Sequence, residues 1–104
     1  MFSYERWRAW LEERPAELGR EGLRIEFRSG PQDVPKPGMT LGIVGLNAMA
    51  SFESWITGEC DYTIMAPVGP KAKMISHKWM QVLTDETFEA TFDEFVGEFR
   101  KYEN

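Results

Sequence analysis

Apolar residues recur at helical spacing near the end of the chain. They fall at i, i+4, i+7, i+8, i+11 and i+14 and form one stripe: Phe88, Phe92, Phe95, Val96, Phe99 and Tyr102. Thr84 is expected to cap this helix, with Asp85 and Glu86 in its first turn, where the helix dipole favours acids. Such a stripe must pack on a broad apolar surface, and that requirement constrains the rest of the fold.

Four segments before this helix have the patterns of strands: residues 23–28, 39–46, 49–57 and 60–66. Alternation is strict in the first, where Leu23, Ile25 and Phe27 share one face. Segment 39–46 is apolar on both faces, which predicts a central strand. The connections are short or rich in Pro and Gly, as in the loop over 29–38. The pattern therefore predicts an antiparallel meander.

The third and fourth segments form a predicted hairpin around Gly58-Glu59, a two-residue turn with glycine first. The inward residues are expected to be Ala50, Phe52, Ile56, Cys60, Tyr62 and Ile64. The outward residues are expected to be Glu53, Trp55, Thr57, Asp61, Thr63 and Met65. The two sets separate core positions from an open face.

Two further elements complete the expected fold. Residues 3–14 have the apolar spacing of a helix that Ser3 caps and Pro15 interrupts. Residues 73–83 resemble a fifth strand with imperfect alternation, which predicts a bulge or a bend. We therefore expect one α+β domain over residues 1–104: a four- to five-stranded antiparallel meander with the N-terminal and C-terminal helices packed on one face.

Charge narrows the class of partner. The net charge is −5, and the excess of acid lies in the second half, where residues 53–104 hold five Lys or Arg against ten Asp or Glu. An acidic surface repels phosphate, so we expect no nucleic acid, and a basic protein cleft fits better. The single cysteine and the lack of a long apolar run predict a cytoplasmic protein that does not bind membranes.

Residues suited to catalysis are few. Cys60 is expected to point into the core and His77 is the one histidine, so neither a Cys/His nucleophile pair nor a zinc site is predicted. No glycine spacing matches a phosphate-binding loop. We expect no enzymatic activity, no cofactor and no metal.

A partner-binding surface is predicted at the hairpin of the third and fourth strands. Its residues are Glu53, Trp55, Glu59 and Asp61, with Trp79 from the fifth strand as a further apolar contact. A tryptophan on an open sheet face is costly to leave in water, and Trp is enriched at binding hot spots. Two alternatives stay open. The loop over 29–38 could cover Trp55, or the acidic face of the last helix, with Glu89, Asp93 and Glu94, could be the interface.

The hairpin also carries a family resemblance. Residues 51–65 read SFESWITGECDYTIM, in which Trp55, Gly58, Cys60 and Asp61 follow a short Trp-Gly-Cys-Asp pattern. With Trp7 and Trp10 in a first helix and an amphipathic last helix, the layout resembles that of the TriTu family of small bacterial immunity proteins. The loop over 29–38 and the glycine-rich strand that follows depart from it, which puts loop-borne contacts in doubt.

The resemblance implies a specific function. Members of that family are antidotes to ADP-ribosyltransferase toxins that type VI or related secretion systems deliver, and the toxin modifies an elongation factor. By this resemblance the chain would bind the toxin domain in a one-to-one complex, block its NAD or substrate site and have no activity of its own.

Other functions also fit the sequence. An unrelated immunity protein or adaptor of this size would bind another effector, and a small-molecule-binding domain would need no toxin. A hydrolase that reverses ADP-ribosylation would need positioned carboxylates and usually a metal. A toxin gene beside this one, or a tight complex on co-purification, would separate these possibilities.

Overall fold

The computed structural model describes residues 1–104, apart from the side chain of Met80. In this chain one antiparallel sheet has five strands in sequence order: β1 (Arg24–Ser29), β2 (Gly38–Val44), β3 (Met49–Trp55), β4 (Glu59–Ala66) and β5 (Lys73–Val82). The helices are α1 (Tyr4–Glu12), α2 (Arg14–Gly19) and α3 (Phe88–Glu103). The predicted α+β meander is confirmed.

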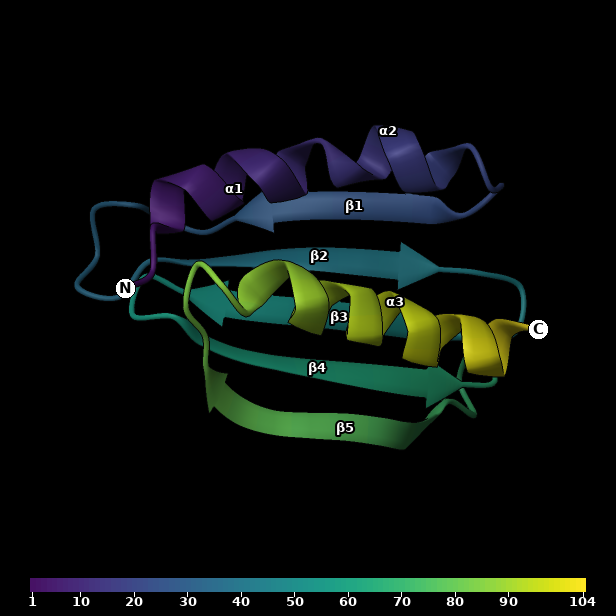
Figure 1. The fold of residues 1–104 in the computed structure, drawn as a ribbon. Coiled ribbons are helices and arrows are strands. Elements are labelled where there is room, and N and C mark those ends of the chain that lie inside the picture. Colours follow the sequence, from purple (N-terminus) through teal and green to yellow (C-terminus); the bar gives the residue numbers. More distant parts are fainter.

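The helices lie on one face of the sheet (Figure 1). Helices α1 and α2 run along β1, whereas α3 lies over β3 and contacts β3 and β4. The strand β5 forms the opposite edge of the sheet. Both terminal helices therefore share a face, as the apolar patterns predicted.

The core lies between this face and the helices. Buried and half-buried residues alternate along β2, β3 and β4. The sheet contributes Met39, Leu41, Ile43, Ala50, Phe52, Cys60, Tyr62 and Ile64 to the buried cluster. Helix α3 contributes Phe88, Phe92, Phe95, Val96 and Phe99, so the predicted stripe is the core side of the helix.

Phe88 joins the N-terminal region and the start of α3 to the sheet. Its ring is fully buried, with its centroid 4.5 Å from that of Trp7 in α1 and 5.6 Å from that of Phe52 in β3. The rings of Phe2 and Trp10 lie 5.6 and 6.0 Å away. Aromatic pairs at these separations stabilise beyond the area they bury.

The N-terminal region differs from its prediction. Pro15 does not end the helical region, because it lies in the first turn of α2, where proline loses no helical hydrogen bond. Ser3 occupies the cap position of α1, but its hydroxyl makes no capping bond and donates to Asp85. The missed helix α2 buries Leu18.

The expected start of the last helix was also wrong. Helix α3 begins at Phe88, Thr87 holds the cap position, and Asp85 lies in the turn before it. Asp85 instead accepts hydrogen bonds from Ser3 N, Ser3 Oγ and Trp7 Nε1, each 2.8 Å long. These bonds lower the pKa of Asp85 to about 2 and tie the start of α1 to the segment before α3.

Two strands end earlier than predicted. β2 ends at Val44, so Leu46 lies in the following turn and is 89% exposed. β2 also alternates in burial and lies second in the sheet, so it is not the central strand. Glu103 of α3 holds this turn, because its carboxylate accepts hydrogen bonds of 2.8 to 2.9 Å from the backbone N–H groups of residues 46, 47 and 48.

The β3–β4 turn has three residues, 56–58, instead of the predicted two. Ile56 therefore leaves the strand and is exposed, which corrects its inward placement. Gly58 is the last turn residue, with φ +88°. A side chain there would be strained by that φ and would meet the Leu83 carbonyl, so the position requires glycine.

A single core substitution tests this packing. We expect Phe95→Ala to lower the free energy of unfolding by about 3–5 kcal/mol, because the buried ring contacts Phe52, Tyr62 and Phe92 and leaves a cavity when removed. Urea unfolding measures the change. Glu89→Ala, at an exposed position of the same helix, is the control and should change stability little. Equal effects of the two would contradict the packing.

Candidate partner interface

The open face of the sheet holds two carboxylates directly opposite each other. Glu53 of β3 pairs in register with Asp61 of β4, and both are half-buried on the side away from the helices. Desolvation, and then the charge of Asp61, raises the pKa of Glu53. Desolvation also raises the pKa of Asp61, against an opposing effect of His77. Like charges placed opposite each other destabilise a sheet, so this pair costs the fold stability.

Trp55 lies beside this pair on the same face. It packs over Gly38 of β2 so closely that a Cβ atom there would lie 2.9 Å from the indole Cδ1. Lys36, from the loop between β1 and β2, lies over the ring at 5.7 Å from its centroid. The loop therefore covers part of Trp55 and leaves it half-buried. This result lies between the two predictions, a Trp55 open to a partner and a Trp55 covered by the loop.

Lys36 also forms an ion pair with Glu59 at the start of β4. This contact connects Glu59 to Trp55 through one cation and partly neutralises the acid. No sequence pattern indicated a role for Lys36, because the pairing joins residues 23 positions apart. Beside these groups, Gly30, Gly38, Met39, Thr40, Glu53 and Trp55 line a hollow of about 210 Å³.

Trp79 extends the open face onto β5. It is 76% exposed, the most exposed aromatic position named for the interface, and its ring meets that of His77 edge-on at 4.9 Å. His77 Nδ1 in turn shares a 2.8 Å hydrogen bond with Thr63 Oγ1 of β4. The structure therefore places Glu53, Trp55, Glu59, Asp61 and Trp79 on adjoining strands β3, β4 and β5.

The cysteine and the histidine lie on opposite sides of the sheet. Cys60 is buried toward the helices, and burial raises the pKa of its thiol to about 12, so little thiolate exists at neutral pH. His77 pairs with Thr63 on the open face. Across the described part of the chain, no three His, Cys, Asp or Glu side chains are arranged to hold a metal ion.

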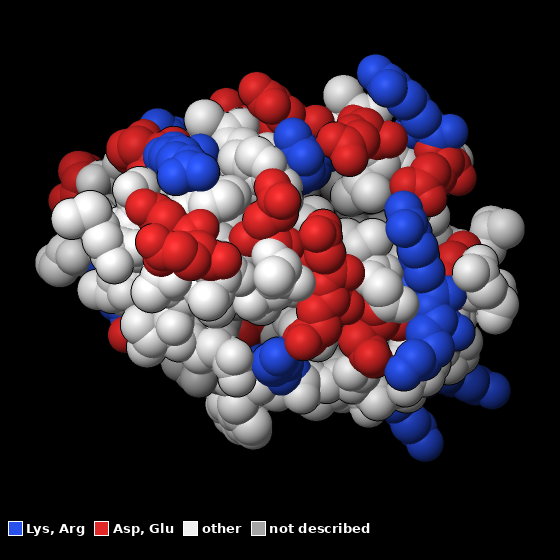
Figure 2. Space-filling model, viewed as in Figure 1, with Lys and Arg blue, Asp and Glu red and all other residues white. Residues whose placement is uncertain are grey.

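A rival surface lies on the helix face. Acidic side chains gather there over α3 (Figure 2), and on that helix the acids include Glu89, Asp93, Glu94 and Glu98. Two of them are already bound within the chain, since Glu94 pairs with Lys78 at 2.7 Å and Glu98 with Lys101 at 3.2 Å. The acid of this face is therefore partly neutralised.

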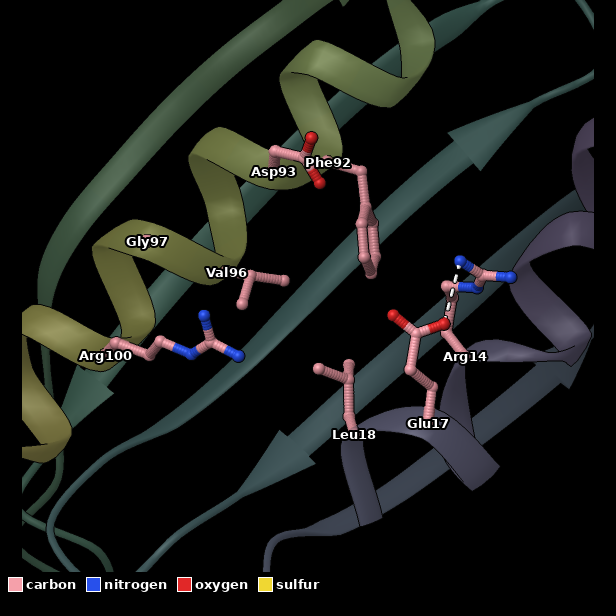
Figure 3. A pocket seen from close by; sticks show the side chains of 8 residues that line it. All are labelled: Arg14, Glu17, Leu18, Phe92, Asp93, Val96, Gly97 and Arg100. Carbon is pink, nitrogen blue, oxygen red and sulfur yellow. Dashed lines mark ion pairs between the residues drawn. The ribbon is translucent and has the colours of Figure 1, made fainter. Parts of the chain in front are cut away.

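A hollow of about 260 Å³ separates α2 from α3 on this side (Figure 3). Its apolar wall comes from Leu18, Phe92 and Val96. The two arginines at its rim are already in ion pairs, because Arg14 pairs with Glu17 at 3.1 Å and Arg100 with Glu21 at 2.7 Å. Both arginines of the hollow are thus already paired, and Asp93 adds a negative charge to its lining.

A match to a known protein family identifies the family of this chain. Residues 5–98 match the family described as Immunity protein TriTu. The chain belongs to that family. No curated protein and no solved structure matches the chain.

Membership gives this immunity protein its general role and its general kind of partner, a toxin. The match spans α1 through most of α3 and so includes the β3–β4 hairpin. Within the described residues, no helix is both long and apolar enough to cross a membrane.

Replacing one carboxylate tests the electrostatics of the interface. A folded pKa above the unfolded value means that ionisation of Asp61 opposes folding above pH 3.8. We expect Asp61→Asn to raise the free energy of unfolding at pH 7, with the gain disappearing as pH falls below that value. It should also lower the pKa of Glu53 by removing a neighbouring negative charge.

Urea unfolding at several pH values and NMR titration of Glu53 measure these two effects. Asp33→Asn, at an exposed loop position, is the matched control and should change neither. A loss of stability at pH 7 in Asp61→Asn would show that its carboxylate makes a favourable contact.

Proposed function

We propose that this immunity protein binds its cognate toxin domain in a one-to-one complex and covers the active site. The toxin is an ADP-ribosyltransferase of a type VI or related secretion system, and the complex forms in the cytoplasm. The family supports the antidote role, and the resemblance in the Trp55–Asp61 hairpin is the source of the toxin class.

The paired carboxylates Glu53 and Asp61 carry the argument for the interface. A fold gains nothing from two like charges facing each other at half-buried positions, and the pKa of each is raised. A cationic group of a partner would relieve that repulsion and make charge-assisted hydrogen bonds. A site that binds the anionic phosphates of NAD is cationic, so it matches this pair in charge.

The aromatic side chains supply the apolar part of the same surface. Trp55 borders the carboxylates and Trp79 lies exposed on β5, and large aromatic side chains dominate binding hot spots. Glu59 contributes less charge, because Lys36 already pairs with it. The proposed interface therefore has an acidic centre flanked by two indole rings.

We propose further that the protein inhibits without catalysing a reaction. The high pKa of the Cys60 thiol and its place across the sheet from His77 support this, since a nucleophile needs a base within hydrogen-bond reach.

Charge reversal on the two acidic surfaces tests the interface. We expect Glu53→Lys with Asp61→Lys to weaken toxin binding by about a hundredfold or more. The melting temperature should change little, because the two lysines of the variant repel each other as the two carboxylates of the wild type do. Glu89→Lys with Asp93→Lys, on α3, is the matched control and should do little. Calorimetry measures the affinities. If the α3 variant alone loses binding, the interface lies on the helix face.

A second test concerns the absence of catalysis. We expect His77→Gln and Cys60→Ala to protect cells from the toxin as the wild type does, because neither group takes part in a reaction. Circular dichroism checks the fold, since removing the buried Cys60 sulfur leaves a small cavity. Loss of protection in a folded His77→Gln protein that still binds the toxin would contradict a purely binding function.

A further inference from the structure

The two edges of the sheet are protected very differently. At the β1 edge, the exposed positions carry charges of both signs, Arg24, Glu26 and Arg28, and helices α1 and α2 run alongside (Figure 1). Charged side chains and covering helices are the usual means by which proteins prevent an edge from pairing with another strand. β1 therefore has the features of an edge that does not pair with a strand of another molecule.

The edge formed by β5 has the opposite character. β5 is the longest strand, ten residues, and its strand pairing in the sheet is with β4 alone. It exposes four large apolar side chains along its length: Met74 (60%), Ile75 (38%), Trp79 (76%) and Val82 (73%). Exposed apolar groups beside open backbone donors and acceptors mark a surface that another strand can cover.

Irregular pairing helps to expose these side chains. The register between β4 and β5 shifts twice, once between Met65 and Ile64 and once between Tyr62 and Cys60. Ile75 and Trp79 fall within these irregular stretches, and such bulges redirect side chains. Between the shifts, residues 76–78 pair regularly with β4.

Charge indicates what would cover this edge. No acidic residue occurs between Asp61 and Asp85, whereas this interval holds Lys71, Lys73 and Lys78. In a chain of net charge −5, the segment that forms β5 is thus locally basic. Lys78 is paired with Glu94, but Lys71 and Lys73 stay exposed at the start of the strand. A partner strand of complementary charge is acidic.

We propose that the toxin extends this sheet: an extended, acidic segment of the toxin pairs with the open edge of β5 as a sixth strand, with its apolar side chains on Trp79 and Val82. This inference rests on the proposed function for the identity of the partner. Strand addition gives affinity through main-chain hydrogen bonds and specificity through side-chain contacts. The exposed lysines lie at the end of β5 that pairs with Ala66, and the acidic Glu53–Asp61 pair lies toward its other end, so the two charges together fix one orientation of the toxin.

The test compares hydrogen exchange in this protein, free and bound to its cognate toxin domain. We expect amide exchange in residues 73–82 to slow in the complex. Trp79→Ser with Val82→Ser should raise the Kd by about tenfold or more, and so should Lys71→Glu with Lys73→Glu. Leu46→Ser removes an equally exposed apolar side chain from the β2–β3 turn and should leave the Kd unchanged.

Each other outcome has a definite meaning. A tight complex in which β5 exchange and the β5 variants are unaffected overturns this inference and leaves the proposed function standing. Failure to form any complex overturns the proposed function itself. Self-association of the wild type that Trp79→Ser with Val82→Ser abolishes, with toxin binding unchanged, assigns the edge to a second copy and also overturns the inference.

Discussion

The fold depends on the burial of one phenylalanine ring between the N-terminal helix and the sheet. Phe88 begins α3 and contacts Trp7 of α1 and Phe52 of the central strand, so one side chain joins two helices to the sheet. Asp85 lies three residues earlier and holds the start of α1 through hydrogen bonds. Together they position α1 over an otherwise uncovered part of the sheet. Packing and polar contacts thus act on the same junction, and each restricts the geometry of the other.

Since the helices cover one face, the other face is free to carry side chains that do not favour folding. Glu53 and Asp61 repel each other on that face, and Trp79 is exposed to water. The strands beneath them hold their register through the buried residues on the opposite side, such as Phe52 and Tyr62. A one-residue slip would exchange the two faces, so the core fixes where the acids and the indole rings appear. The core therefore specifies the proposed partner surface without sharing residues with it.

Periodic features were predictable from the sequence, and long-range features were not. The apolar stripe of α3 and the strand alternation depend on spacing alone, so they predicted the helices on one face and the outward Glu53 and Asp61. The role of Asp85 was missed because its hydrogen-bond partner Ser3 lies 82 positions away. The same holds for the pairing of Lys36 with Glu59. The β3–β4 turn was misassigned because turn length depends on backbone conformation at Gly58, which composition does not reveal.

The hydrogen bonds between Ser3 and Asp85 have a consequence for folding during synthesis on the ribosome. Residues that close the core lie far apart in the sequence, so α1 lacks its contacts with Asp85 and Phe88 until that segment has left the exit tunnel. The strands leave the tunnel earlier, so the part of the sheet that α3 covers stays exposed during that interval. Contacts so distant in sequence form slowly because a long loop must close first. The contacts of α1 with Asp85 and Phe88 therefore form late in folding, after every strand of the sheet has been synthesised.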